Sequence, residues 1–197
     1  FTMQKSEANT RFAKFIEESY EGWMTDPKVK KPVMSHNLLK TKVFPLLKGN
    51  DPLFFILIDN FRLDQWKLME EIINDLFAVE ADETYYSILP TSTSYARNAI
   101  FSGMTPYDMA KQTPDLWVTD EGDNEEGLNK NEEEYLQRQM KKNNLPHKMS
   151  YHKILNNNQA KSLVDNFSRL VQDDFVVVVY NFIDMLSHAR TDMAVIK

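Results

Sequence analysis

The sequence predicts an α/β fold in which a short N-terminal helical segment precedes a parallel sheet flanked by helices. Two continuous apolar runs carry this prediction, at residues 53–58 and 175–182, because strands of a parallel sheet are buried on both faces. Apolar residues at helical period follow the first run over residues 62–79. Strands that alternate with helices favour right-handed crossovers between parallel strands.

The first 50 residues predict helices only, and we assign them to a helical segment separate from residues 51–197. Residues 7–24 form the first predicted helix, whose aromatic face suits core packing or a helical partner. That face consists of Phe12, Phe15, Ile16, Tyr20 and Trp23. A second helix is expected to start with Ser35 as its N-cap, to kink or end at Pro45 and to stop at Gly49.

The larger segment predicts three further strands and three further helices after residue 80. The strands are expected at residues 84–89, 150–155 and 175–182, and the helices at residues 94–102, 131–142 and 160–171. Residues 113–134 are rich in aspartate and glutamate, which predicts a solvated loop that leads into an exposed helix. A calcium loop is the sharper alternative, but the ligand spacing of an EF-hand is not met.

Composition limits the function classes. The chain has 197 residues, no cysteine and a net charge of −6, which excludes disulfides and cysteine-ligated zinc and argues against nonspecific nucleic-acid binding. No apolar run reaches the length of a membrane-spanning helix, and no secretion signal is visible at Phe1. We therefore expect a soluble, cytoplasmic protein without membrane insertion, and we interpret the chain as a piece of a longer one.

Polar residues follow three of the predicted strands. Asp59 follows the first, the hydroxyl-rich segment 91–94 follows the second, and Asp184 with His188 follows the last. Because ligand crevices form outside the carboxyl ends of parallel strands, Asp59, Thr93, Asp184 and His188 are expected to meet there. Carboxylates and imidazole bind Zn²⁺, and a metal activates a neighbouring hydroxyl. The pattern indicates metal-assisted hydrolysis of a phosphate ester.

Each of these residues also has a plain structural interpretation. Asp59 and the hydroxyls of residues 91–94 are residue types that cap helices, and Arg97 and Asn98 could lie on the surface or contact a substrate phosphate. One metal could be held in part by Asp184 and His188, and a second by Asp59 and Thr93. These ligands are too few for two metals, so we expect further histidine and aspartate ligands after Lys197. The metals are expected to be two zinc ions, with Mn²⁺ as an alternative.

At these residues the chain resembles the alkaline phosphatase superfamily. The segment from Pro90 to Thr93 with Ser102-Gly103 is similar to its nucleophile segment, in which the threonine ten residues before the glycine attacks phosphorus. That resemblance selects Thr93 as the nucleophile and matches Asp59, Asp184 and His188 to metal ligands. Ser94-Tyr95-Ala96 departs from the usual Phe-Pro-Asn, so substrate contacts from that segment do not transfer.

The chain resembles still more closely the PglZ domain of PorX-type response regulators. The resemblance rests on residues 32–36, 43–45, 54–66 and 95–103. It implies an incomplete alkaline-phosphatase-like sheet at residues 51–197, truncated at its C-terminus, after a helical middle segment. It also implies a cytoplasmic two-component regulator of type IX secretion with a zinc-dependent phosphodiesterase that acts on nucleotides or cyclic oligonucleotides. The partners it implies are a sensor histidine kinase, secretion-motor proteins and a sigma factor, with a homodimer formed on phosphorylation.

Two functions therefore remain as hypotheses. In the first, Thr93 attacks a phosphodiester in the full-length protein, and this chain alone is inactive. In the second, the chain is a non-enzymatic scaffold for dimerisation and partner docking, and the aromatic face of residues 12–23 is the contact surface.

Overall fold

The chain folds around a three-stranded parallel sheet in the computed structural model, which describes residues 1–49, 51–118, 129–181 and 183–184. The strands are β1 (Leu53–Ile58), β2 (Met149–Ile154) and β3 (Phe175–Tyr180), in the order β1-β3-β2. Tyr180 is level with Ile58 on one side and with Ile154 on the other, so the three strands end together. The α/β class predicted from the sequence is confirmed.

Seven α-helices and three short helical turns accompany the sheet in the described part of the chain. The helices are α1 (Thr2–Thr25), α2 (Leu63–Asn74), α3 (Thr93–Ser102), α4 (Pro106–Gln112), α6 (Glu132–Lys142), α7 (Asn157–Asp165) and α8 (Phe167–Leu170). The turns are η1 (Ser35–Asn37), η2 (Leu39–Val43) and η3 (Phe44–Leu46). No helix among the described residues has both the length and the apolar character that crossing a bilayer requires.

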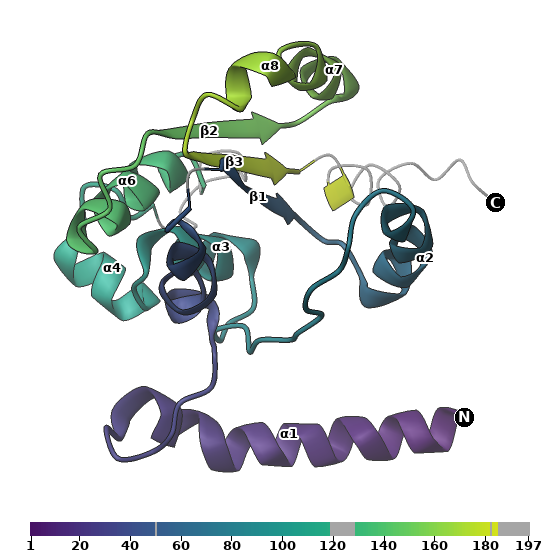
Figure 1. Ribbon diagram of the computed structural model, residues 1–197. Coiled ribbons are helices and arrows are strands. Elements are labelled where there is room, and N and C mark those ends of the chain that lie inside the picture. The colour runs from purple at the N-terminus through teal and green to yellow at the C-terminus, as the bar shows by residue number, and fades with distance from the viewer. Residues whose placement is uncertain (50, 119–128, 182, 185–197) are drawn as a thin grey trace, which may run out of the picture.

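The two faces of β3 divide the hydrophobic core. Successive strand residues point to opposite faces, so Val176 and Val178 pack under α7 and α8, while Phe175, Val177 and Val179 pack against α3 and α6. Figure 1 shows α7 and α8 above the sheet and α3, α4 and α6 below it. The sheet is thus covered on both faces, as the continuous apolar sequence of β3 predicts.

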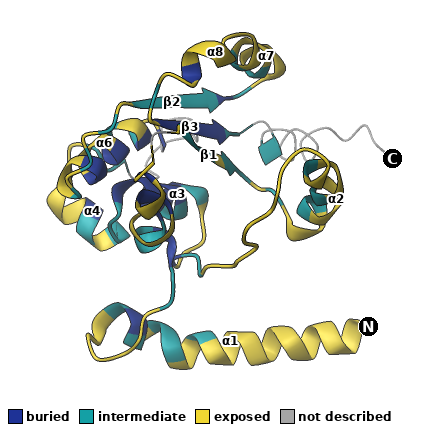
Figure 2. Cartoon of the chain, viewed as in Figure 1, coloured by how far each residue is buried: buried dark blue, intermediate teal, exposed yellow. Residues whose placement is uncertain are grey.

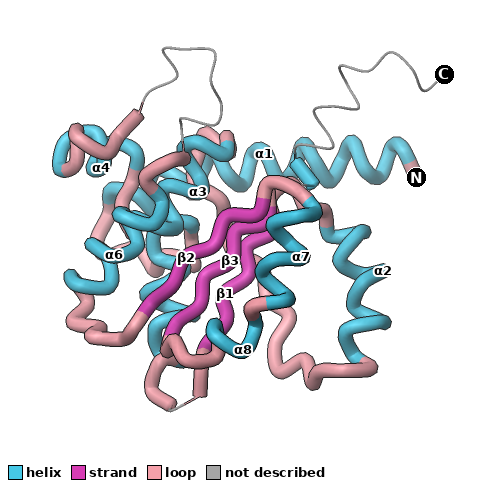
Figure 3. The backbone as a smooth tube through the Cα atoms, turned by 90° about the horizontal axis from the view of Figure 1, so that it is seen from above, coloured by secondary structure: helices cyan, strands magenta, loops and turns pink. Residues whose placement is uncertain are grey.

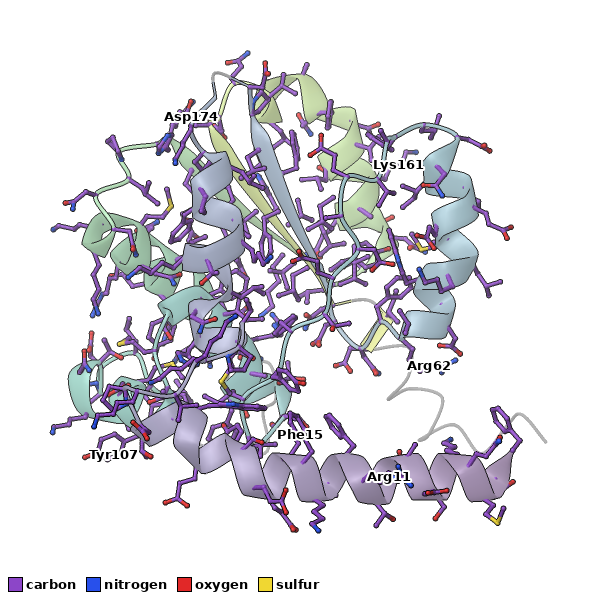
Figure 4. All side chains as sticks on the ribbon, turned by 60° about the horizontal axis from the view of Figure 1, so that its bottom comes forward. Arg11, Phe15, Arg62, Tyr107, Lys161 and Asp174 are labelled. Carbon is purple, nitrogen blue, oxygen red and sulfur yellow. The ribbon has the colours of Figure 1, made fainter. Side chains whose placement is uncertain are left out.

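Helix α1 lies apart from the sheet and is mostly exposed (Figure 2). Its aromatic residues pack on Tyr86, whose ring centroid lies 4.9 Å from that of Trp23 and 6.5 Å from that of Phe12. Phe15 points from α1 toward the rest of the chain (Figure 4). Part of the predicted aromatic face is therefore used for packing within the chain.

Two predictions of local structure are wrong. Residues 84–89 do not form a strand of the sheet, because they pair with the segment before η1: the N–H of Tyr86 donates to the carbonyl of Val33 over 2.9 Å. Ser35 does not cap a helix, since its hydroxyl accepts a hydrogen bond from the N–H of Ile88. The predicted helix after it is instead divided into η1, η2 and η3, with Pro45 in the last.

The prediction of an exposed helix at residues 131–142 is also wrong in one respect. Helix α6 forms at the predicted place, but one face is buried against α3. The buried residues are Glu132, Tyr135, Leu136, Gln139 and Met140. The acidic composition of its first turn concealed the fact that Glu132 is fully buried, whereas Glu133 is exposed and Glu134 is half-buried.

Candidate functional site at the carboxyl edge of the sheet

The candidate site lies where the three strands end together (Figure 3). Asp59 and Asn181 come directly after β1 and β3, and the N–H of Asp59 donates to the carbonyl of Tyr180 over 3.1 Å. The N–H of Asn181 donates in turn to the carbonyl of Ile154 at the end of β2. These bonds continue the ladder by one residue and fix both polar side chains at the same edge.

Helix α3 brings Arg97 to this edge. The Arg97 Nη1 donates to Asp59 Oδ2 over 2.9 Å and also donates to Asn181 Oδ1. Its Nε and Nη2 donate to the two carboxylate oxygens of Glu132, over 2.8 and 2.6 Å. The side chains of Arg97 and Glu132 are 4% and 0% exposed, and that of Asp59 is 13% exposed. A bidentate pair of this kind is among the strongest interactions of a guanidinium.

Two residues of β2 complete the surroundings of Glu132. The hydroxyl of Tyr151 donates to Glu132 Oε2 over 2.7 Å, and the Lys153 Nζ lies 3.7 Å from the same oxygen. Burial and the neighbouring charge of Glu132 raise the pKa of Tyr151 well above its usual range, so the hydroxyl keeps its proton and acts as a donor. Burial lowers the pKa of Lys153.

The charges of this group determine the state of Arg97. Burial acts to lower the pKa of Arg97, but the charges and hydrogen bonds of Glu132 and Asp59 outweigh burial and raise it. The guanidinium therefore keeps its charge. Asp59 also affects Tyr85, whose pKa is raised by burial and then by the negative charge of that carboxylate.

Thr93 occupies the first position of α3, and Ser92 is the N-cap residue without a side-chain capping bond. Thr93 and Arg97 are four residues apart on one helix, which places them on the same face, one turn from each other. Thr93 is partly buried, and the guanidinium of Arg97, one turn further along the helix, contacts Asp59. The end of α3 is fixed by Gly103, whose φ of 66° suits glycine and whose missing Cβ leaves room for Gln139.

The remaining predicted residues have different positions. Asp184 lies four residues after the end of β3, within a short helical stretch that includes Ile183. Asn98 is buried in α3, and its side-chain amide donates to the carbonyl of Ser94 over 2.7 Å. Arg97 is engaged by carboxylates, so its predicted contact with a substrate phosphate stays a prediction. His188 lies outside the described residues, as do residues 119–128 of the acidic segment.

Sequence reasoning missed Glu132, Tyr151 and Asn181. Asn181 had a signal, since it follows a buried strand just as Asp59 does. Glu132 and Tyr151 had none, because an acidic helix start and an alternating strand are common on protein surfaces. Only the packing of α3 on α6 shows that these residues enclose Arg97.

The donor atoms offered by the predicted metal ligands are of types that bind a divalent cation. The described residues, however, supply too few donors for a metal site. Asp59, Asp184 and Thr93 offer carboxylate and hydroxyl oxygens, which both zinc and manganese accept. Within the described ranges, however, no three His, Cys, Asp or Glu side chains come together as a metal-binding group. Asp59 in particular is paired with Arg97.

Comparison with known families agrees with this geometry. The model of the BREX system PglZ alkaline phosphatase-like domain matches residues 38–196, which is most of the chain. The chain belongs to the PglZ family of alkaline phosphatase-like domains. The model of the PorX response regulator linker domain matches residues 1–24, the region of α1. No curated protein matches the chain.

The two family matches confirm the resemblance to PglZ-domain, PorX-type regulators. They associate this PglZ chain with two-component signalling, because the linker domain belongs to response regulators. The division at residue 50 stays a prediction, since one match begins at residue 38 and the other ends at residue 24.

Proposed function

We propose that this chain carries part of the active site of a metal-dependent phosphodiesterase, the effector of a two-component regulator of type IX secretion. The observation that supports the proposal is that Thr93 begins α3 one turn before Arg97, whose guanidinium donates to Asp59 after β1. Membership of an alkaline phosphatase-like family supports hydrolysis of phosphate esters as the reaction class. The proposed substrates are nucleotides and linear or cyclic oligonucleotides.

In this proposal the Thr93 hydroxyl attacks the phosphorus atom of the diester. A bond forms between Thr93 Oγ1 and phosphorus, the bond from phosphorus to the leaving alkoxide breaks, and the hydroxyl proton is transferred to the leaving oxygen. Water then attacks the phosphorus of the phosphothreonine ester and releases Thr93. In this proposal the reacting phosphate lies beside the N-terminus of α3, where the helix dipole favours negative charge.

Asp59, Thr93, Asp184 and His188 are the residues proposed to contribute to the metal sites, together with further donors. A bound zinc or manganese ion would lower the pKa of the Thr93 hydroxyl and stabilise negative charge on the phosphoryl oxygens. Arg97 and Asn98 contribute by holding Asp59 and the first turn of α3 in place. The proposed partners are a sensor histidine kinase, secretion-motor proteins and a sigma factor.

Substitution of the nucleophile tests this proposal. Thr93→Ala in the full-length protein is expected to lower turnover of a chromogenic phosphodiester about a thousandfold or more, because a nucleophile cannot be replaced by its neighbours. Ser92→Ala is the matched control, since Ser92 is the adjacent hydroxyl and makes no capping bond to the α3 backbone. Thr93→Ala with the activity of the wild type, or equal losses in both variants, would show that Thr93 is not the nucleophile.

A non-enzymatic scaffold is the second candidate, and exposed apolar residues favour it. Phe12 and Phe15 remain 55% and 41% exposed on α1, even though Tyr86 packs against both. A contact surface of this kind predicts a mass that rises with concentration in light scattering. Phe12→Ala should abolish the rise, and a mass that is constant with concentration in the wild type would exclude dimerisation through this face.

A further inference from the structure

Two cationic side chains, Arg97 and Lys153, lie beside Glu132, and they differ in how far the fold already uses them. The Arg97 side chain is 4% exposed and donates four hydrogen bonds to three neighbours. A guanidinium held in this way has little donor capacity left for a ligand. A phosphate bound at this edge of the sheet therefore needs another cation.

Lys153 lies in β2, level with Val179 of β3 and one residue before the point where the three strands end. Strand residues two apart share a face, so Lys153 lies on the same face as Tyr151, where Glu132 is found. The Lys153 Nζ donates to the carbonyl of Asn129 over 3.2 Å, and its distance of 3.7 Å from Glu132 Oε2 exceeds that of a hydrogen bond. The ammonium therefore keeps an N–H donor that the described residues do not take up.

The charge of Lys153 is also incompletely balanced by its neighbours. Its side chain is 24% exposed, so the ammonium can be reached from solvent. Burial lowers the pKa of Lys153 and outweighs the carboxylates of Glu132 and Asp59, which act to raise it. A further negative charge beside the ammonium would offset this cost of burial.

We propose that Lys153 binds the phosphate group of the substrate at the carboxyl edge of the sheet through a charge-assisted hydrogen bond. This inference deepens the proposed function and rests on it in so far as the substrate is taken to be a phosphate ester. The ammonium suits a single non-bridging oxygen, because lysine binds phosphate as a point charge, whereas bidentate recognition requires a free guanidinium. Arg97 then holds Asp59 and Glu132 in place and leaves the anion to Lys153.

Binding of adenosine monophosphate (AMP) to the full-length protein tests the proposal, because it requires a phosphate site but no turnover. Lys153→Met keeps the apolar stem and removes the charge. We expect the dissociation constant in isothermal titration calorimetry to rise about tenfold or more through the loss of a hydrogen bond between charged groups. Lys148→Met is the matched control, because Lys148 lies just before β2, at the other end of the strand, and pairs with Asp173.

Chemical labelling of the wild type is a second measurement, which does not depend on a variant that folds. Acetic anhydride acetylates accessible lysine amines, and mass spectrometry gives the rate at each lysine. AMP should slow acetylation of Lys153 and leave the rate at Lys148 unchanged, since a bound phosphate covers only the first ammonium. Equal rates at Lys153 with and without AMP would overturn the proposal.

The titration can overturn the proposal in further ways. An unchanged dissociation constant in Lys153→Met, equal increases in Lys153→Met and Lys148→Met, or a wild-type protein that binds no AMP would each do so. Failure of the proposed function has a different signature. A protein that binds AMP through Lys153 but hydrolyses no phosphodiester in the presence of zinc would contradict the proposed function and leave the phosphate contact of Lys153 established.

Discussion

Helices α2 and α3 are both expected from the sequence as helices that flank the sheet, and they differ completely in burial. Seven of the ten residues of α3 are buried, whereas none of the twelve residues of α2 is. The α2 region carries an apolar stripe that is open in the described structure, with Leu68, Ile72 and Leu76 exposed by 75%, 67% and 76%. Apolar periodicity therefore predicts that a helix forms, but not which surface it meets. Of these two helices, α3 is the one held tightly enough to place polar groups for chemistry.

Truncation of a large side chain on each helix tests this contrast most strongly. Phe101 on α3 is fully buried, and its ring packs against those of Phe55 and Tyr151. Phe101→Ala is expected to lower the free energy of unfolding by about 3–5 kcal/mol through lost burial and cavity formation. Leu68→Ala on α2 should change it by less than about 0.5 kcal/mol, because Leu68 is already in solvent. Equal effects in urea unfolding would contradict the contrast.

Substitution of one arginine at each helix is a second test of the difference in burial between α3 and α2. Arg97→Met leaves Glu132 and Asp59 without their partner in a buried site and should destabilise the chain by about 3–5 kcal/mol. Arg62 lies at the surface at the start of α2 (Figure 4) and pairs with Asp64 in solvent. Arg62→Met should therefore have a much smaller effect on the free energy of unfolding, because exposed ion pairs are weak. A small loss for Arg97→Met in urea unfolding would mean that the buried network contributes little to the fold.

Alanine substitution is expected to change the free energy of unfolding in opposite directions at two glycines, Gly103 at the end of α3 and Gly22 within α1. Gly103→Ala is expected to destabilise by about 1–3 kcal/mol, because its φ of 66° is unfavourable for alanine and the new Cβ would collide with Gln139. Gly22→Ala should instead stabilise by about 0.5–1 kcal/mol, since Gly22 lies within α1 and its nearest neighbour would be 3.8 Å from the new Cβ. Differential scanning calorimetry of both variants would reveal any departure from this order.

The smallest effect concerns His36, which lies in η1 against α3. Burial and the positive charge of Lys31 lower the pKa of His36, and Asp108 opposes the shift. The folded chain therefore binds a proton there less readily than the unfolded chain. This contribution to stability is complete above the unfolded pKa of about 6.5 and is lost as the pH falls through the lowered folded pKa. Between pH 7.5 and 5.5, His36→Asn should show a smaller loss of Tm than the wild type.

The sequence predicted most of the secondary structure because local pattern determines it. The strands at residues 53–58 and 175–180 and the helix that begins near Thr93 follow from apolar runs and turn residues. The place of Asp59 at the carboxyl edge also followed, since it depends only on the end of a buried strand. The pairing of residues 33–35 with 86 and 88 could not be predicted, because it joins segments that are distant in sequence.

The buried network around Arg97 could not be predicted from the sequence, for a related reason. Its members come from α3, α6, β2 and the residues directly after β1 and β3, and each has a common surface interpretation when it is considered alone. Arg97 and Glu132 become informative only once α3 packs against α6 and removes both from solvent. Glu132 is then distinguished from the acidic residues beside it, because it is the buried partner of Arg97.

We propose that Asp59 and Thr93 belong to the active site of a metal-dependent phosphodiesterase. Turnover of a chromogenic phosphodiester by the full-length protein, measured with a chelator and again after zinc is restored, tests it most directly. We expect turnover that the chelator removes and zinc restores. Turnover that is insensitive to the chelator, or none at all with zinc present, would contradict the claim.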